Sequence, residues 1–108
     1  MALSPTKESI FDVLEMVRRK PGLYLGGKSI IRLQAFLSGY DSGLGRFHAV
    51  LSRYEEFHPF HDWVANRLGF NNSVPGWCNL ILKRSSADET AYDQFFVLLD
   101  EFKAERGI

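Results

Sequence analysis

The sequence predicts an all-α fold, a compact single-domain bundle of about five helices over residues 1–108. Three observations lead to this prediction. Apolar residues recur at the helical spacing i, i+3, i+4 and i+7, glycine or proline separates the segments that show this spacing, and no stretch has the period-two alternation of a half-buried strand. Two short apolar runs, LYL at 23–25 and NLILK at 79–83, leave an α+β fold with a small sheet as the alternative.

Size and charge narrow the classes of function. A chain of 108 residues and 12.4 kDa has the length of one domain. Thirteen basic and thirteen acidic residues cancel to a formal net charge of zero, so we expect neither a nucleic-acid partner nor a membrane surface. Cys78 is the single cysteine, and the sequence has no signal-peptide pattern and no apolar run of transmembrane length. We therefore expect a cytoplasmic protein.

The first predicted helix precedes Pro21. Ser4 followed by Pro5 is typical of a helix start, and Pro21 ends the helix because the residue before a proline is disfavoured in the helical region. The core-facing residues between them are Ile10, Val13, Leu14 and Val17. The helix ends in cations that complement its dipole: Arg18, Arg19 and Lys20.

Two helices are predicted in the middle of the chain. Ser29 is expected to cap the first, which has an apolar stripe of Ile30, Leu33, Leu37, Tyr40 and Leu44. Three small residues lie four apart on this helix, namely Ala35, Gly39 and Gly43. They indicate either close packing against another helix, which we favour, or an early end of the helix. The second helix lies in RFHAVLSRYEEF at 46–57, with Phe47, Val50, Leu51 and Tyr54 at helical spacing. The sequence does not fix the boundaries between Gly39 and Pro59.

Three helices are predicted in the C-terminal part. Pro59 begins one that ends at Gly69 and has the apolar face Phe60, Trp63, Val64 and Leu68. Ser73 with Pro75 begins the next, which has the apolar residues Trp77, Leu80 and Ile81 and the basic end Lys83 and Arg84. Ser86 and Glu89 match the capping box of the last helix. Its face runs almost to Gly107 and comprises Ala91, Tyr92, Phe95, Phe96, Leu99 and Phe102.

The stretch RRKPGLYLG, residues 18–26, resembles the segment near the start of the ATPase domain in DNA gyrase B and its relatives, with a match over residues 14–26. The resemblance implies a following helix with a water-activating glutamate and a magnesium-binding asparagine, and then an Asp-x-Gly-x-Gly motif that reads the adenine. DSGLG at 41–45 spells that motif, but SIIRLQAFLSGY before it contains neither a glutamate nor an asparagine. Asp41 also follows Gly26 by only fifteen residues. We therefore expect no catalytic residue, no cofactor and no enzymatic activity.

The basic turn is the remaining candidate site. It comprises six residues that are candidates for contact with an anion or a partner protein: Arg18, Arg19, Lys20, Tyr24, Lys28 and Arg32. The simpler interpretation is that a basic helix end and a Pro-Gly turn redirect the chain onto the core, with LYL buried. Both interpretations stay open at this stage.

Other chemical patterns are weaker. His58, His61 and Asp62 have metal-ligand chemistry, but no fourth ligand is indicated, so we expect no metal site. Cys78 lies on an apolar face and is expected to be an inert, buried thiol.

The aromatic residues at helical spacing are interpreted as core, with any surplus available for an interface: Trp63, Trp77, Phe95, Phe96 and Phe102. If clustered, the acidic set could block a basic nuclease: Glu55, Glu56, Asp88, Glu89, Asp93, Asp100, Glu101 and Glu105.

These observations favour a small, soluble, non-enzymatic protein-protein interaction domain of bacterial type. Its most concrete form is an immunity or antitoxin-like inhibitor of a partner protein, whose identity the sequence does not give. The alternative is a domain that binds phosphate or a small molecule at the basic turn, residues 18–28. DNA binding would require a helix rich in exposed arginine and lysine, and the sequence shows none.

Overall fold

The computed structural model describes the backbone of residues 9–44 and 54–108, and the side chains of residues 9–39 and 55–108. In these ranges every secondary-structure element is a helix, which confirms the all-α prediction. The elements are α1 (Ile10–Arg19), α2 (Pro21–Leu25), α3 (Ile30–Leu44), α4 (Tyr54–Phe57), α5 (Phe60–Leu68), α6 (Gly76–Lys83) and α7 (Asp88–Arg106). The α+β alternative is wrong for the described residues, because LYL lies in α2 and NLILK lies in α6.

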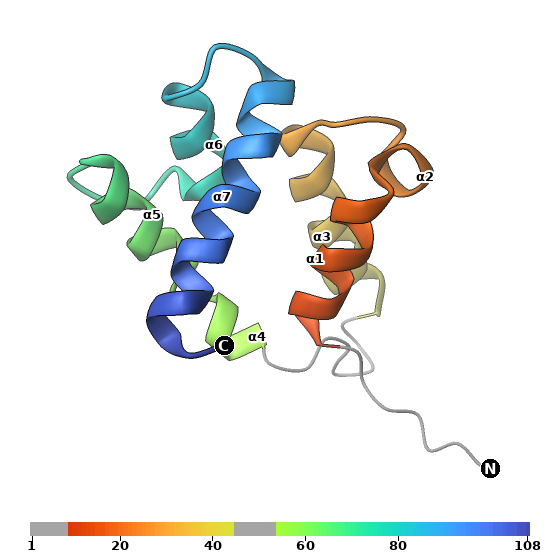
Figure 1. The fold of residues 1–108 in the computed structure, drawn as a ribbon, viewed down its shortest axis with the longest axis horizontal. Coiled ribbons are helices and arrows are strands. Elements are labelled where there is room, and N and C mark those ends of the chain that lie inside the picture. The colour runs from red at the N-terminus through yellow and green to blue at the C-terminus, as the bar shows by residue number, and fades with distance from the viewer. Residues whose placement is uncertain (1–8, 45–53) are drawn as a thin grey trace.

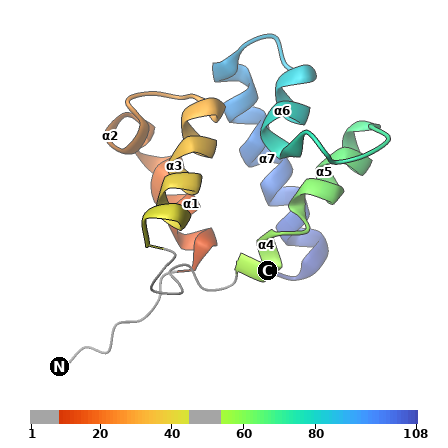
Figure 2. The same ribbon diagram turned by 180° about the vertical axis from the view of Figure 1, so that it is seen from behind.

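Helix α7 runs through the middle of the molecule. Figures 1 and 2 show α1, α2 and α3 on one side of it and α5 and α6 on the other. The short helix α4 lies near the C-terminal end of α7 (Figure 1). α7 contacts α3, α5 and α6, so its apolar face joins the two halves of the chain.

The first helix begins later than the sequence suggests. Ser9 caps α1, because its Oγ accepts a hydrogen bond of 3.1 Å from the backbone N–H of Phe11. The predicted cap, Ser4 with Pro5, lies outside the described residues. The helix ends at Arg19 as expected, but Pro21 then begins a new helical turn, in which a proline loses no hydrogen bond. The LYL run is thus helical, and of its three residues only Leu25 is buried.

Helix α3 confirms one local prediction and contradicts another. Ser29 is its cap, since the Ser29 Oγ accepts from the N–H of Arg32 at 3.0 Å. The close packing predicted for the small residues is wrong at Ala35 and Gly39, which are both exposed. A Cβ atom added to Gly39 would meet no atom within 4 Å, so no neighbouring helix requires a glycine there. The stripe residues Ile30, Leu33 and Leu37 are buried, whereas the side chains of Tyr40 and Leu44 and the burial of Gly43 lie outside what is described.

The middle helices agree with the sequence where they are described. Only α4 represents the helix predicted in 46–57, and its other expected apolar residues lie outside the described ones: Phe47, Val50 and Leu51. Helix α5 follows Pro59 and stops at Gly69, which has a left-handed φ of 82°. Helix α6 follows Pro75, and its C-cap Arg84 donates to the carbonyl oxygen of Leu68 at 3.3 and 3.2 Å. This bond satisfies a carbonyl at the end of α5.

The predicted capping box of α7 is wrong. Ala87 is the N-cap residue and makes no side-chain cap, and the Ser86 hydroxyl lies 3.4 Å from that of Thr90. The predicted apolar face is confirmed, and Gly107 ends the helix with a φ of 70°. The buried residues of α7 are Ala91, Tyr92, Phe95, Phe96, Leu98, Leu99 and Phe102.

An aromatic cluster forms the centre of the core, as the sequence predicts. Phe60 of α5 is fully buried, and its ring centroid lies 5.2 Å from that of Phe102 and 5.5 Å from that of Phe95. Trp77 of α6 lies 4.8 Å from Phe95 and is 4 % exposed. Trp63 is half-buried at the edge of the cluster. Three helices therefore share one set of rings.

The Asp88 carboxylate at the start of α7 caps α3. Its Oδ1 accepts from the N–H groups of Ile30 at 2.7 Å and Ile31 at 3.2 Å, and its Oδ2 accepts from the Ser29 hydroxyl at 2.5 Å. Partial burial raises the pKa of Asp88, but these hydrogen bonds and the charge of Arg32 lower the pKa more, so the net shift is downward. The carboxylate therefore stabilises the N-terminal ends of two helices while ionised.

We predict that Asp88→Ala lowers the free energy of unfolding by about 1 to 2 kcal/mol at pH 7, because backbone donors of α3 lose their partner. The pKa of Asp88 is lower in the folded state than in the unfolded state. The contribution of its carboxylate to stability is therefore complete above the unfolded-state pKa of about 3.9, and it disappears as the pH falls through the folded-state pKa. Urea denaturation at pH 7 and at several acidic pH values measures both effects. The exposed neighbour Glu89→Ala is the control, and equal losses in the two variants would contradict the capping role.

Candidate functional site

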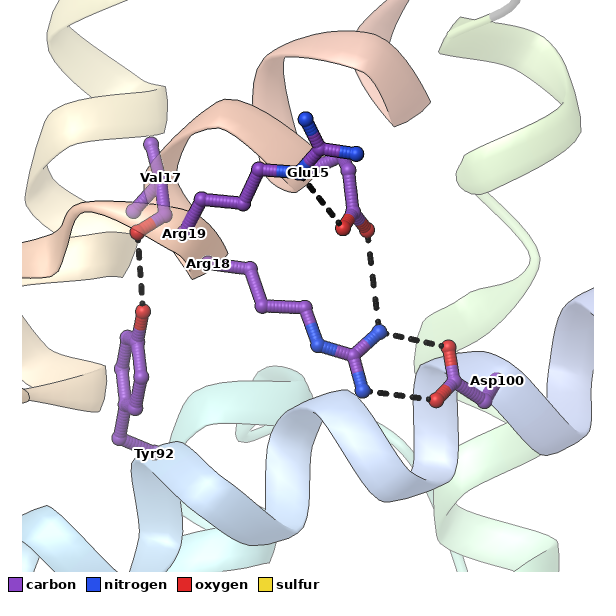
Figure 3. A network of polar contacts seen from close by, with 6 residues as sticks. All are labelled: Glu15, Val17, Arg18, Arg19, Tyr92 and Asp100. Atoms are coloured by element: carbon purple, nitrogen blue, oxygen red, sulfur yellow. Dashed lines mark hydrogen bonds and ion pairs between the residues drawn. The ribbon is translucent and has the colours of Figure 1, made fainter.

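Arg18 of the basic turn is bound to α7. Its guanidinium donates two hydrogen bonds to the Asp100 carboxylate, at 3.0 and 2.9 Å, and lies 3.7 Å from a carboxylate oxygen of Glu15 (Figure 3). The same guanidinium lies over the ring of Phe96, 5.2 Å from its centroid. The two-bond geometry is the strong form of an arginine-carboxylate pair. Arg18 therefore joins α1 to α7.

A second contact between these helices lies next to Arg18. The Tyr92 hydroxyl of α7 donates to the carbonyl oxygen of Val17 at 3.2 Å (Figure 3). Burial, together with the charge of Asp93, raises the pKa of Tyr92 to about 12, so the hydroxyl keeps its proton at neutral pH. Arg19 forms an ion pair of 3.5 Å with Glu15 on its own helix.

The other residues of the basic turn also have partners, with one exception. Lys28 lies 3.3 Å from Asp93, and Arg32 donates to the carbonyl oxygen of Leu25 at 3.1 Å. Tyr24 is half-buried and packs edge-on against Phe36, with ring centroids 6.4 Å apart. Lys20 is exposed, and its side chain makes no hydrogen bond or ion pair with another described residue.

The paired cations of the turn do not converge on one point. Arg18 and Lys28 bind Asp100 and Asp93, which are seven residues apart on α7. At 1.5 Å per residue this is about 10 Å along the helix axis. Arg18 and Lys28 therefore attach the turn to α7 at separate points and do not surround one anion-binding position. The anion site remains an untested hypothesis from the sequence, and the pairing of these cations does not favour it.

His61 lies at the start of α5 and has a structural partner on α6. Its Nδ1 accepts a hydrogen bond of 3.1 Å from the backbone N–H of Trp77, and its ring lies 5.9 Å from that of His58. Burial, and then the proximity of His58, lowers the pKa of His61. The Asp62 carboxylate accepts from the Ser73 hydroxyl. Among the described residues, no three metal-ligating side chains are grouped to hold an ion.

Two cavities adjoin His61, and sequence reasoning missed both. One of about 100 Å³ is lined by polar side chains from three helices, namely Gln34, His61, Cys78 and Asn79. The other, of about 250 Å³, is more open and has His58, His61 and the exposed Val74 in its wall. A helical periodicity cannot reveal these cavities, because the smaller one forms where residues of α3, α5 and α6 meet and the larger one forms between α5 and the loop that leads into α6.

Cys78 and His61 line the same cavity but do not form a nucleophilic pair. The Cys78 thiol donates to the carbonyl oxygen of Ile30 at 3.7 Å, and the Nδ1 of His61 is occupied by the Trp77 N–H. Burial, and then the charge of Asp88, raises the pKa of Cys78 to about 11. The thiol is therefore protonated at neutral pH and is a poor nucleophile. This agrees with the expectation of an inert cysteine, although its side chain is only partly buried.

Most of the acidic set is also used inside the fold. Asp93, Asp100 and Glu101 pair with basic side chains, in the last case with Arg67 at 2.9 Å. Glu105 accepts from the indole N–H of Trp63 at 3.1 Å. Six members of the set are exposed, namely Glu55, Glu56, Glu89, Asp93, Asp100 and Glu105, and the last three are among those with partners. A cluster of unpaired carboxylates is therefore not found on the described part of α7.

The stretch that matches the adenine-binding motif has a different local structure here. Residues 41–44 of DSGLG belong to the C-terminal end of helix α3, and Gly45 lies outside the described residues. The segment thus continues the helix that begins at Ile30. Comparisons with protein-family models, curated proteins and solved structures find no match to this chain. Among the described residues, no helix combines the length and apolarity needed to cross a membrane.

We predict that phosphate does not stabilise the protein. At about 10 mM inorganic phosphate, with sodium chloride of equal ionic strength as the reference, Tm should change by less than about 1 °C, because most cations of the turn are already paired. Differential scanning fluorimetry measures this shift. A rise of several degrees that Lys20→Ala and Arg19→Ala abolish would instead establish a phosphate site at the basic turn.

We also predict that Cys78 reacts slowly in the folded protein. With its pKa at about 11, its reaction with a disulfide reagent near pH 7.5 should be more than about a hundredfold slower than in the urea-unfolded chain. Absorbance of the released thiol reports both rates. Similar rates in the two states would show that the thiol is activated or freely accessible.

Proposed function

We propose that the protein is a non-enzymatic, cytoplasmic binding protein that acts by docking onto another protein. Its most concrete form is an immunity or antitoxin-like inhibitor. The observation that carries this proposal is the exposure of Leu23 in α2, whose side chain is 71 % exposed although the helix is firmly attached. The internal pairing of the neighbouring cations supports an apolar docking contact in preference to a phosphate site.

The attachment of α2 explains why Leu23 faces solvent. Leu25 is buried in the core, and its carbonyl oxygen accepts from Arg32 of α3. Tyr24 packs on Phe36 of the same helix. Leu23 precedes these two anchored residues in a helical turn and is therefore directed away from them. Because the two residues after Leu23 are anchored, docking at this position requires little ordering of the backbone.

Lys20 completes the proposed contact. It lies at the start of α2, three residues before Leu23, and is exposed. An apolar side chain next to a cation has the mixed character of protein interfaces, in which apolar contacts are central and charged groups lie at the rim. We call Lys20, Leu23 and the half-buried Tyr24 the α2 surface. Binding through the α2 surface requires no cofactor and no catalytic group.

We predict that Leu23→Ser weakens binding to the natural partner at least about tenfold, which corresponds to about 1.4 kcal/mol. Affinity capture from native lysate with mass spectrometry identifies the partner, and a titration then gives the Kd of each variant. Val74→Ser is the matched control, because Val74 is 88 % exposed and lies on the loop before α6. Equal weakening by both substitutions, or by neither, would contradict docking through the α2 surface.

The inhibitor role has a separate readout. The activity of the captured partner should fall in proportion to added wild-type protein, and Leu23→Ser should require a correspondingly higher concentration. A partner that binds through the α2 surface but keeps its full activity would support docking and overturn inhibition.

A further inference from the structure

A histidine side chain holds the N-terminus of α6. The Nδ1 of His61 accepts from the N–H of Trp77, which is the second residue of α6. The first-turn N–H groups of a helix have no partner within the helix, so His61 fills the position of a capping side chain from a neighbouring helix. Pro75, at the N-cap position, makes no side-chain cap.

This hydrogen bond fixes the protonation state of His61. An Nδ1 that accepts a hydrogen bond carries no proton, so the imidazole is neutral with its proton on Nε2. Protonation of Nδ1 would place two donors, the ring N–H and the Trp77 N–H, against each other. It would also put a cation at the positive end of the α6 dipole.

The polar groups around His61 belong to three parts of the fold: α5 with the segment before it, α6 and α3. His58, before α5, lowers the pKa of His61, and the adjacent Asp62 raises it to a lesser degree. From α6, Cys78 lines the shared cavity and stays protonated at neutral pH. From α3, the cavity receives the uncharged Gln34. No carboxylate is therefore hydrogen-bonded to the imidazole among the described residues, and burial is the largest cause of its lowered pKa.

The start of α6 is joined to the aromatic core, so a contact that holds it also affects the core. Trp77 is 4 % exposed and contacts the rings of Phe57, Phe60 and Phe95. The ring of His61 also packs on Gly76, where an added Cβ atom would lie 3.7 Å from Nδ1. Both cavities at His61 have Gly76 in their walls. A displacement of this turn would open the cavities and loosen the aromatic cluster.

We propose that His61 is a pH-sensitive latch, which holds the N-terminus of α6 while the imidazole is neutral and releases it when Nδ1 is protonated. The latch goes beyond the proposed docking function and does not depend on it. Because the folded state favours the neutral imidazole, the stabilisation is present above the unfolded histidine pKa of about 6.5 and is lost as the pH falls through the lower folded value.

The test compares the full-length wild-type protein with His61→Asn between pH 7.5 and pH 5. The asparagine Oδ1 can accept the Trp77 N–H and does not titrate in this range. The protection factor of the Trp77 amide against hydrogen exchange should fall at least tenfold in the wild type over this range and stay within about twofold in His61→Asn. His58→Asn is the control: it keeps the latch and should move the transition to higher pH, because His58 lowers the pKa of His61 and this effect is removed.

Nitrogen NMR of the wild type gives an independent readout if His61→Asn does not fold. The Nε2–H tautomer should be present at pH 7.5, and the Trp77 amide shift should follow the titration of His61 with the same midpoint, below the ordinary histidine value. The latch is overturned if His61 carries its proton on Nδ1 at pH 7.5, if it titrates at or above the ordinary value, or if the wild type and His61→Asn lose protection equally.

Discussion

Asp88 is the first residue of α7, and its carboxylate accepts hydrogen bonds from backbone N–H groups at the start of α3. Through Ile30, Ile31 and Ser29 it fixes the start of α3 against the start of α7. A helix N-terminus packed against protein needs such acceptors, because its first N–H groups otherwise lose water without replacement. α2 is attached to α3 through Arg32, so this contact places α2 and α3, while α1 is also joined to α7 directly by Arg18 and by the hydrogen bond from Tyr92.

The other carboxylates of α7 extend the same arrangement along the helix. Lys28 and Arg18 bind it from the N-terminal side, and Arg67 binds it from α5. Each exposed pair contributes little alone, typically 0 to about 1 kcal/mol. Their common effect is geometric, since each fixes how a helix lies against α7. The cations of the basic turn therefore act largely within the fold. For this reason we place the proposed binding surface at the exposed Leu23 of α2.

The sequence predicts the features of this fold that depend on near neighbours. Helical spacing identifies the buried faces, and Ser29, Gly69 and Gly107 end or begin helices by local chemistry. Long-range partners are not readable in this way. Asp88 lies 59 residues from Ser29, and that tertiary contact occupies the start of α7, where a capping box was expected. The bond from Trp77 to His61 and the exposure of Gly39 also depend on which helices meet, and residue spacing does not contain that information.

A double-mutant cycle on Arg18 and Asp100 tests most directly whether the basic turn is part of the fold. The free energies of unfolding of the wild type, Arg18→Met, Asp100→Ala and the double variant give the coupling between the two side chains at low ionic strength. The pairing described here predicts a favourable coupling of about 0.5 to 1 kcal/mol that decreases with added salt. Zero coupling, with Arg18→Met as stable as the wild type, would contradict a structural role and return Arg18 to the set of free ligand-binding cations.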